Sequence, residues 1–177
     1  MGYLIREAEH RDRAALAELK SRYVRSMYRG FFSREVLDRI DDEFYAPEFS
    51  EYISSDQFHT IVMEHEGRLE GYVIYGPDPE EEGWGLIVDA HTVHPGDAER
   101  KRILIEDTLN RLEKMGFNDV RIWLVHDNFR VRFLFESFGF RRDGEERMAI
   151  RSGQELHTVR YQYRIHKEAP VDIDMEF

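Results

Sequence analysis

Two side chains that can exchange protons stand two residues apart near the middle of the chain. Asp89 and His91 lie in the apolar-rich segment 84–93, which is predicted to be a strand. Because side chains alternate along a strand, the carboxylate and the imidazole would lie on the same side of a sheet. Such a pair can act as a general base or acid near neutral pH. The alternative is a strand-end hydrogen-bonding aspartate and a packed histidine, and the spacing alone does not separate the two.

A second candidate site is the turn that follows this strand and enters a predicted helix. Residues 96–102 read Gly-Asp-Ala-Glu-Arg-Lys-Arg. Such a turn can bind an anion because unpaired N–H groups and the helix dipole point at it. Arg100, Lys101 and Arg102 would add positive charge, whereas Asp97 adds negative charge. The alternative is a solvated, charge-rich first helical turn that binds nothing.

The composition excludes several other kinds of site. The chain has no cysteine, so disulfides, thiolate metal sites and cysteine nucleophiles are ruled out. The histidines are scattered and lack the i, i+4 pairing of a helical zinc site, so no metal is expected. No serine nucleophile elbow is present. A net charge of −11 argues against a nucleic-acid partner, because the phosphate backbone would be repelled.

Length and hydropathy indicate one globular domain. The chain has 177 residues, 41% hydrophobic and 34% charged, and a single domain is predicted over residues 1–167. No stretch approaches the roughly 20 apolar residues that span a membrane, and residues 1–13 lack the apolar region of a signal peptide. We therefore expect a cytoplasmic protein with no membrane partner. Residues 168–177 are an acidic tail, which would either fray or pair with a second copy to give a homodimer.

Hydrophobic periodicity predicts the elements that position these residues. Apolar residues recur at three- and four-residue intervals in four segments, which are predicted helices beginning near residues 12, 33, 97 and 128. Strand-like segments are predicted at 3–8, 58–65, 69–75, 84–93, 120–125, 140–150 and 158–166. Pro47 begins an irregular or short helical connection after the second helix. The order is βααβββαβαββ, which is typical of an α+β fold.

Residues 128–140 carry the most specific pattern in the chain. They read Asn-Phe-Arg-Val-Arg-Phe-Leu-Phe-Glu-Ser-Phe-Gly-Phe, so an asparagine opens a helix, aromatic residues follow on it, and a Gly-Phe corner begins the next strand. Together with Val93-His94-Pro95 before the long helix, this segment makes the chain resemble the GNAT superfamily of N-acetyltransferases over nearly its whole length.

The resemblance implies a fold and a cofactor. It implies a mixed, mostly antiparallel central sheet with helices on both faces, and a V-shaped splay between strands 86–93 and 120–125. The pantetheine arm of acetyl-CoA, the co-substrate, would lie in this splay. The amine acceptor would approach from the opposite side.

The resemblance also implies residue roles. Asp89 matches the place where related enzymes often carry a glutamate base, and His91 is the second catalytic candidate. Phe135 stands where many relatives carry a tyrosine that acts as the acid, and it has no proton to donate. The implied coenzyme-binding residues are Thr92, Val93, Arg100, Lys101, Arg102, Ile103, Asn128 and Phe135. The implied acceptor-binding residues are Tyr28, Phe31, Phe32 and Glu81.

The implied function is transfer of an acetyl group from acetyl-CoA to a primary amine of a small molecule or of a protein or peptide. The turn 96–102 departs from the family pattern, because the glycines expected after Gly96 are replaced by larger side chains. Two alternatives therefore stay open. One is a GNAT-like module that binds acyl-CoA with little or no turnover, and the other is an oligomeric interaction protein.

Overall fold

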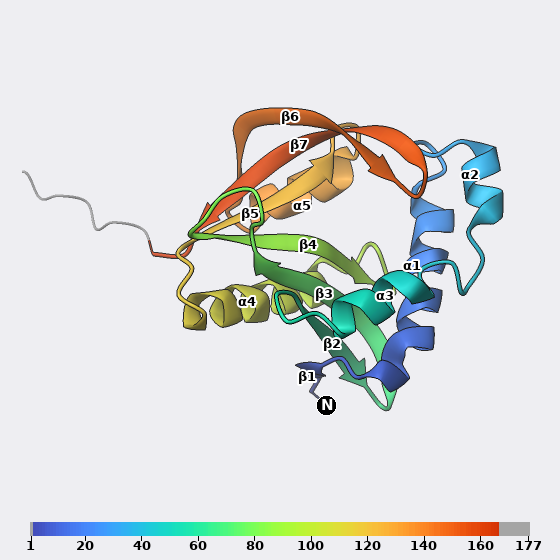
Figure 1. Cartoon of the computed structure of the whole chain (residues 1–177), viewed down its shortest axis with the longest axis horizontal. Coiled ribbons are helices and arrows are strands. Elements are labelled where there is room, and N and C mark those ends of the chain that lie inside the picture. The colour runs from blue at the N-terminus through green and yellow to red at the C-terminus, as the bar shows by residue number, and fades with distance from the viewer. Residues whose placement is uncertain (1, 167–177) are drawn as a thin grey trace, which may run out of the picture.

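One twisted sheet runs through the protein and joins strands that are far apart in the sequence. The computed structural model describes residues 2–166, so the predicted tail 168–177 lies outside the described residues. The strands are β1 (Leu4–Glu7), β2 (His59–His65), β3 (Arg68–Pro77), β4 (Trp84–Thr92), β5 (Asp119–Val125), β6 (Arg141–Arg151) and β7 (Gln154–Arg164). Their spatial order is β1-β2-β3-β4-β5-β7-β6 (Figure 1). Within residues 2–166 only β4 and β5 pair in parallel, which confirms the mixed, mostly antiparallel sheet.

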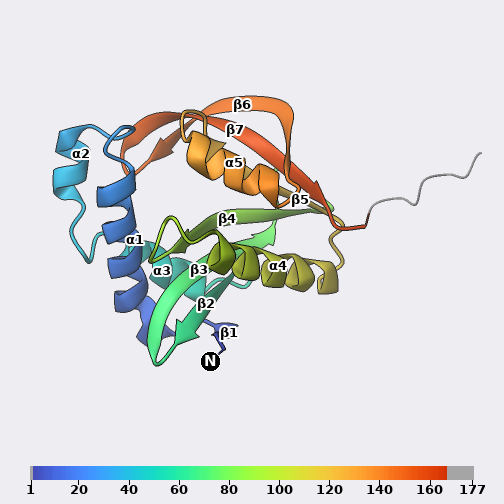
Figure 2. The same ribbon diagram turned by 180° about the vertical axis from the view of Figure 1, so that it is seen from behind.

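Helices cover both faces of the sheet, as predicted. They are the short 3-10 helix η1 (His10–Asp12), α1 (Arg13–Met27), α2 (Arg34–Arg39), α3 (Ala46–Ile53), α4 (Ala98–Lys114) and α5 (Phe129–Ser137). α1 and α3 pack on one face, whereas α4 packs on β3 and β4 from the other face, where α5 also lies (Figures 1 and 2). The predicted order differs by one helix. The connection at Pro47 is the helix α3, because proline is well tolerated in a first helical turn.

The alternation of side chains along β2 and β3 builds a separate apolar core on each face. Ile61, Met63 and Val73 pack with α4 in one cluster. Their sequence neighbours Val62 and Tyr72 pack with α1 and α3 in the other. All five are fully buried, and each contributes on the order of 2 kcal/mol through burial. The two cores hold β4 rigidly between the helix layers. None of the helices within residues 2–166 has the length and apolar character of a membrane span.

The parallel strands β4 and β5 are hydrogen-bonded at one end only. Their register ends where Ile87 pairs with Ile122. Beyond that point β4 continues to Thr92 against β3, and β5 continues to Val125 against β7. Figure 1 shows the two strands diverging toward α1. The sheet therefore contains the splay that the resemblance implied, a slot whose two backbone edges have no strand partner.

Candidate active site

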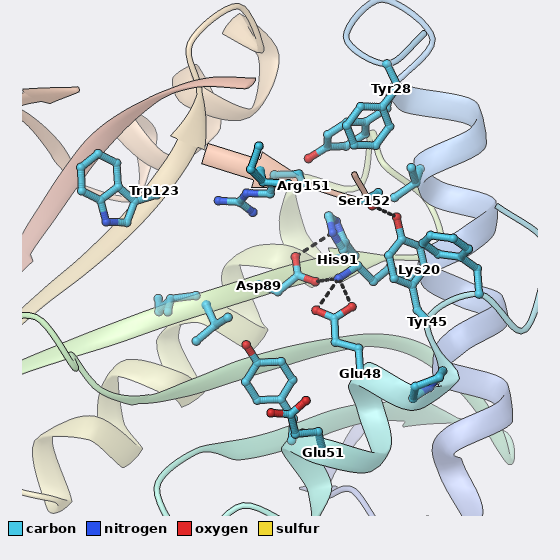
Figure 3. Close-up of a pocket in the computed structure, with 18 of the residues that line it drawn as sticks. Lys20, Tyr28, Tyr45, Glu48, Glu51, Asp89, His91, Trp123, Arg151 and Ser152 are labelled. Atoms are coloured by element: carbon cyan, nitrogen blue, oxygen red, sulfur yellow. Dashed lines mark hydrogen bonds and ion pairs between the residues drawn. The ribbon is translucent and has the colours of Figure 1, made fainter. Parts of the chain in front are cut away.

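The slot between β4 and β5 is continuous with a cavity of about 610 Å³ on the α1 and α3 side of the sheet. The cavity and the slot share the side chains of Tyr28, Val88, Asp89, His91, Trp123 and Arg151. Figure 3 shows Asp89 and His91 on β4, with Arg151 on one side and Glu48 on the other. The structure thus brings the two predicted catalytic residues together at the junction of slot and cavity.

The carboxylate of Asp89 is surrounded by donors. Lys20 Nζ lies 2.9 Å from Oδ2, and the Tyr72 hydroxyl donates to the same oxygen at 2.7 Å. His91 Nε2 lies 2.8 Å from Oδ1, which also accepts from the Ala90 N–H at 3.1 Å. Both oxygens are therefore engaged, and the carboxylate is held in one orientation.

These contacts determine the charge of Asp89. Burial raises the pKa of Asp89, but the charges and hydrogen bonds of His91 and Lys20 outweigh burial and hold it well below its usual value. Burial likewise opposes the charge of Lys20, whereas Asp89 and Glu48, each 2.9 Å away, raise the Lys20 pKa overall. Both groups stay ionised at neutral pH. A carboxylate with so low a pKa is a weak base.

His91 is the better placed of the two to accept a proton. Its Nε2 faces a carboxylate, which accepts only, so a neutral ring carries its proton on Nε2 and leaves Nδ1 bare. Nδ1 is buried and has no hydrogen-bond partner among the described residues. Burial lowers the pKa of His91, Asp89 acts in the opposite direction, and the net pKa lies below its usual value. The ring is therefore neutral at pH 7, with a free lone pair.

Lys101 does not reach solvent, contrary to the phosphate-binding role expected for it. Its side chain is 3% exposed, lines the slot together with Phe135, and donates from Nζ to the Ala90 carbonyl at 3.2 Å. Burial lowers the pKa of Lys101 to about 8, opposed only by the charge of Asp89. The slot therefore contains an ammonium group that can lose its proton near neutral pH.

The N-terminus of α4 is already occupied by a carboxylate of the chain itself. Asp97 Oδ1 accepts from the Arg100 N–H at 3.0 Å, and Oδ2 lies 2.8 Å from Arg100 Nη1. Arg100 Nε donates to the Tyr3 hydroxyl at 2.7 Å, which turns the guanidinium toward the β1 side. The predicted turn thus has its own anion, and Arg100 is committed to internal contacts.

Two other arginines border this turn with no ion pair among the described residues. Arg102 is exposed, and its guanidinium lies 5.3 Å from the centre of the Phe138 ring, just after the end of α5. Arg130, in the first turn of α5, is also exposed, and its Nη2 lies 2.9 Å from where a β-carbon on Gly96 would be. Gly96 therefore leaves room for Arg130, a cation that the sequence analysis did not single out.

The remaining predicted coenzyme residues surround the slot in different ways. Asn128 and the buried Phe135 line it, and Asn128 Oδ1 also caps α5 by accepting from the Val131 N–H at 3.3 Å. The other three do not line the slot. Thr92 is fully buried, Val93 is exposed, and Ile103 packs on the α4-side core.

The predicted acceptor residues separate into two groups. Tyr28 and Phe32 line the cavity, whereas Phe31 and Glu81 do not. Glu81 Oε2 instead lies 2.7 Å from Arg121 Nη2, so its carboxylate ties the 78–83 loop to β5. Within residues 2–166 no group of three or more His, Asp or Glu side chains could hold a metal ion.

Sequence reasoning missed most of the polar side chains around Asp89. Lys20 had a detectable signal, because it falls on the buried stripe of α1, four residues after Leu16 and four before Val24. A charged residue on an apolar stripe indicates a buried partner. Glu48 and Arg151 had none, since Glu48 lies in the segment expected only as an irregular or short helical connection, and Arg151 ends a strand most of whose residues are exposed.

Solved structures with the same fold are acetyltransferases. The chain is similar to an acetyltransferase of the GNAT family from Streptococcus pneumoniae, with 21% identity, a TM-score of 0.64, and coverage of 93% of this chain and 100% of that one. A ribosomal-protein-alanine N-acetyltransferase from Brucella melitensis matches with 20% identity and a TM-score of 0.69, covering 91% of this chain and 99% of that one. The PaiA N-acetyltransferase from Thermoplasma acidophilum, solved with coenzyme A, matches with 14% identity and a TM-score of 0.69. The match covers 93% of this chain and 99% of that one.

At these identities the comparisons establish the fold, which is that of the GNAT acetyltransferases. No protein-family model and no curated protein sequence matches the chain. The activity must therefore be argued from the site itself.

Proposed function

We propose that the protein is an acetyl-CoA-dependent N-acetyltransferase that acts on a primary amine of a small molecule or of a protein or peptide. The observation that carries the proposal is the buried, unpartnered Nδ1 of His91, at the junction of a narrow slot in the sheet and a cavity large enough for an acceptor. The neighbour solved with coenzyme A supports the choice of co-substrate.

The slot suits the arm of acetyl-CoA. An extended chain that carries amide groups can hydrogen-bond to the free edges of β4 and β5 as an added strand would. Asn128 and Phe135 line the slot beside it. The phosphates would meet Asp97 at α4, so Arg102 and Arg130 are the side chains that would balance their charge.

His91 would accept the proton of the attacking amine. The amine nitrogen forms a bond to the thioester carbonyl carbon, and its proton passes to His91 Nδ1. Asp89 acts through His91, because its carboxylate fixes the Nε2–H tautomer and stabilises the imidazolium that forms. Lys20 and Tyr72 hold that carboxylate in place.

Lys101 would supply the proton for the leaving group. As the bond between carbon and sulfur breaks, the sulfur takes the electron pair and Lys101 Nζ donates a proton to it, which gives the free thiol. The other hydroxyls that line the slot are weaker acids, since burial raises the pKa of Tyr23 and raises that of Tyr28 to about 12. Lys101 would thus replace the acid that Phe135 cannot be.

The second candidate function is an acyl-CoA-binding module with little turnover. Phe135 favours it, because it has no proton to give to the leaving group, while the carboxylate of Asp97 at the helix N-terminus would weaken coenzyme binding through its charge. Asp97→Ser would keep a capping oxygen and remove the charge. On this account the substitution tightens coenzyme binding severalfold, and calorimetric titration checks it.

The direct test measures thiol released from acetyl-CoA in the presence of a panel of amines. We expect amine-dependent release that falls about 100-fold or more in His91→Gln, with the affinity for coenzyme A unchanged. His10→Gln, outside the cavity, is the control and should release thiol at the normal rate. Equal rates in the two variants would remove His91 from the mechanism, and binding without any release would favour the second candidate function.

A further inference from the structure

The charged groups of the 610 Å³ cavity are unevenly paired: among residues 2–166, Arg151 and the exposed Glu51 are the two that make no ion pair. Lys20 is neutralised, because its Nζ lies 2.9 Å from both Glu48 and Asp89. Arg151 also lines the cavity and is only partly exposed, yet it makes no ion pair among residues 2–166. A half-buried guanidinium without a carboxylate is costly unless something outside the chain pairs with it.

Arg147, the other arginine of the cavity, differs from Arg151 in this respect. Its Nη1 lies 2.5 Å from Glu80 Oε1, and its guanidinium stacks 4.0 Å from the centre of the Trp123 ring. Arg147 is therefore already satisfied within the chain. It provides a matched control for any role assigned to Arg151.

Arg151 is held in place by the hairpin that it ends. The next residue, Ser152, is hydrogen-bonded through Oγ to the Tyr45 hydroxyl at 2.7 Å. Gln154 donates to the Phe31 carbonyl at 2.6 Å and accepts from the Ser33 N–H at 2.7 Å. These contacts tie the β6–β7 turn to the segments on either side of α2. The backbone that carries Arg151 is thus fixed before any ligand arrives, which lowers the cost of ordering it on binding.

Arg151 also lies near the reacting groups. Arg151 lines both the cavity and the slot, as do Asp89 and His91. Its charge lowers the pKa of Tyr28, although burial has the larger effect and raises that pKa overall. Figure 3 shows its guanidinium directed into the cavity on the side of Asp89 opposite Glu48. A group bound by Arg151 would lie close to an amine that is within reach of His91.

We propose that the acceptor is an amine that also carries a carboxylate, of the α-amino acid type, and that Arg151 binds this carboxylate. The proposal rests on the proposed function and adds its substrate class. A guanidinium matches a carboxylate with two parallel hydrogen bonds, which would turn the adjacent amine toward His91.

The rest of the cavity specifies the side chain of such an acceptor. Part of its wall is aromatic, formed by Tyr28, Phe32, Phe44, Tyr45, Tyr52 and Trp123. Aromatic walls favour a large apolar group. Aromatic amino acids are therefore the preferred members of the class.

The experiment compares pairs of ligands that differ only in the carboxylate. L-Phenylalanine against 2-phenylethylamine and L-tryptophan against tryptamine are titrated by calorimetry into the protein saturated with free coenzyme A, and also into the protein alone. We expect the amino acid of each pair to bind about tenfold or more tightly in the wild type. The preference should vanish in Arg151→Met and persist in Arg147→Met.

Binding needs no transfer, so this result is independent of whether thiol is ever released from acetyl-CoA. If no thiol is released but the carboxylate preference is present, the proposed function is contradicted and the proposed ligand class is supported. Equal affinity within each pair, binding of neither member, or loss of the preference in both variants would overturn the inference.

Discussion

Burial of the Lys101 ammonium lowers the free energy of unfolding of the protein, so this residue links stability to the proposed catalysis. Its native pKa of about 8 lies below the unfolded value of 10.5. Below pH 8 both states carry the proton, and the native state bears the full cost of burying the charge, about 3 kcal/mol. Between pH 8 and 10.5 the unfolded state binds more protons, so stability rises with pH through this window.

Lys101→Met should therefore stabilise the protein and impair it as a catalyst. We expect the free energy of unfolding at pH 7 to rise by up to about 3 kcal/mol, with the gain disappearing above pH 10.5. Acetyl transfer should fall about tenfold or more. Urea unfolding and thiol release measure the two effects, and a destabilised variant with normal turnover would contradict the role given to Lys101.

The pair of Asp89 and His91 predicts the pH dependence of the rate. Activity should fall at low pH as His91 becomes protonated, at a pH below the usual histidine value, and fall again above about 8 as Lys101 loses its proton. Asp89 raises the pKa of His91, so Asp89→Asn should move the acid limb to lower pH and reduce the rate at pH 7. A profile of kcat against pH for both proteins checks the shift; an acid limb that stays in place would contradict the pairing.

Among the elements, α4 and α5 present their first turns to the same end of the slot. Arg130 lies on the first turn of α5 next to Gly96, and Arg102 lies near the start of α4 with its guanidinium near the Phe138 ring. Neither makes an ion pair among the described residues, whereas Arg100 is bound to Asp97 and Tyr3. The double variant Arg102→Met/Arg130→Met should weaken the affinity for coenzyme A about tenfold or more, while Arg100→Met should change it little. Calorimetry at fixed salt measures both, and the opposite ranking would show that the phosphates bind elsewhere.

Element boundaries were predictable where local chemistry decides them. Asp97, Ser33 and Asn128 cap the helices that were predicted to begin at them. The side chain of each accepts a hydrogen bond from the backbone N–H of the third residue after it. The β2–β3 turn forms at Glu66-Gly67, both with positive φ, as a short hairpin requires. The helix α3 was less clear, since it has only eight residues and a proline in its first turn.

The proximity of Asp89 and His91 was predictable from spacing because one strand carries both. Asp89 and His91 share a face because they are two residues apart on β4. Lys20 and Arg151 approach them from α1 and from the end of β6, which lie 131 residues apart in the numbering, so no local pattern could place them. Glu81 was assigned to the acceptor because it is acidic, but its charge is used by Arg121, a buried partner on another strand.

At the scale of the whole molecule, the divergence of two central strands is the feature on which the proposed function depends. A continuous sheet would have no internal edges, whereas the parting of β4 and β5 after Ile87 leaves two unpaired strand edges inside the sheet. On the proposed function, the cations of α4 and α5 would meet a phosphorylated co-substrate, and the cavity on the α1 and α3 side would take the acceptor. Periodicity predicted the strands, but only the family resemblance implied that these two diverge.

The central claim is that acetyl-CoA binds in this slot, and the most direct test blocks the slot. Calorimetric titration with acetyl-CoA should give micromolar binding to the wild type and to Phe133→Trp, which lies on the exposed face of α5. Binding should be lost in Val131→Trp, whose larger side chain would fill the slot from the same helix. No binding to the wild type at millimolar acetyl-CoA, or equal binding to both variants, would contradict the account.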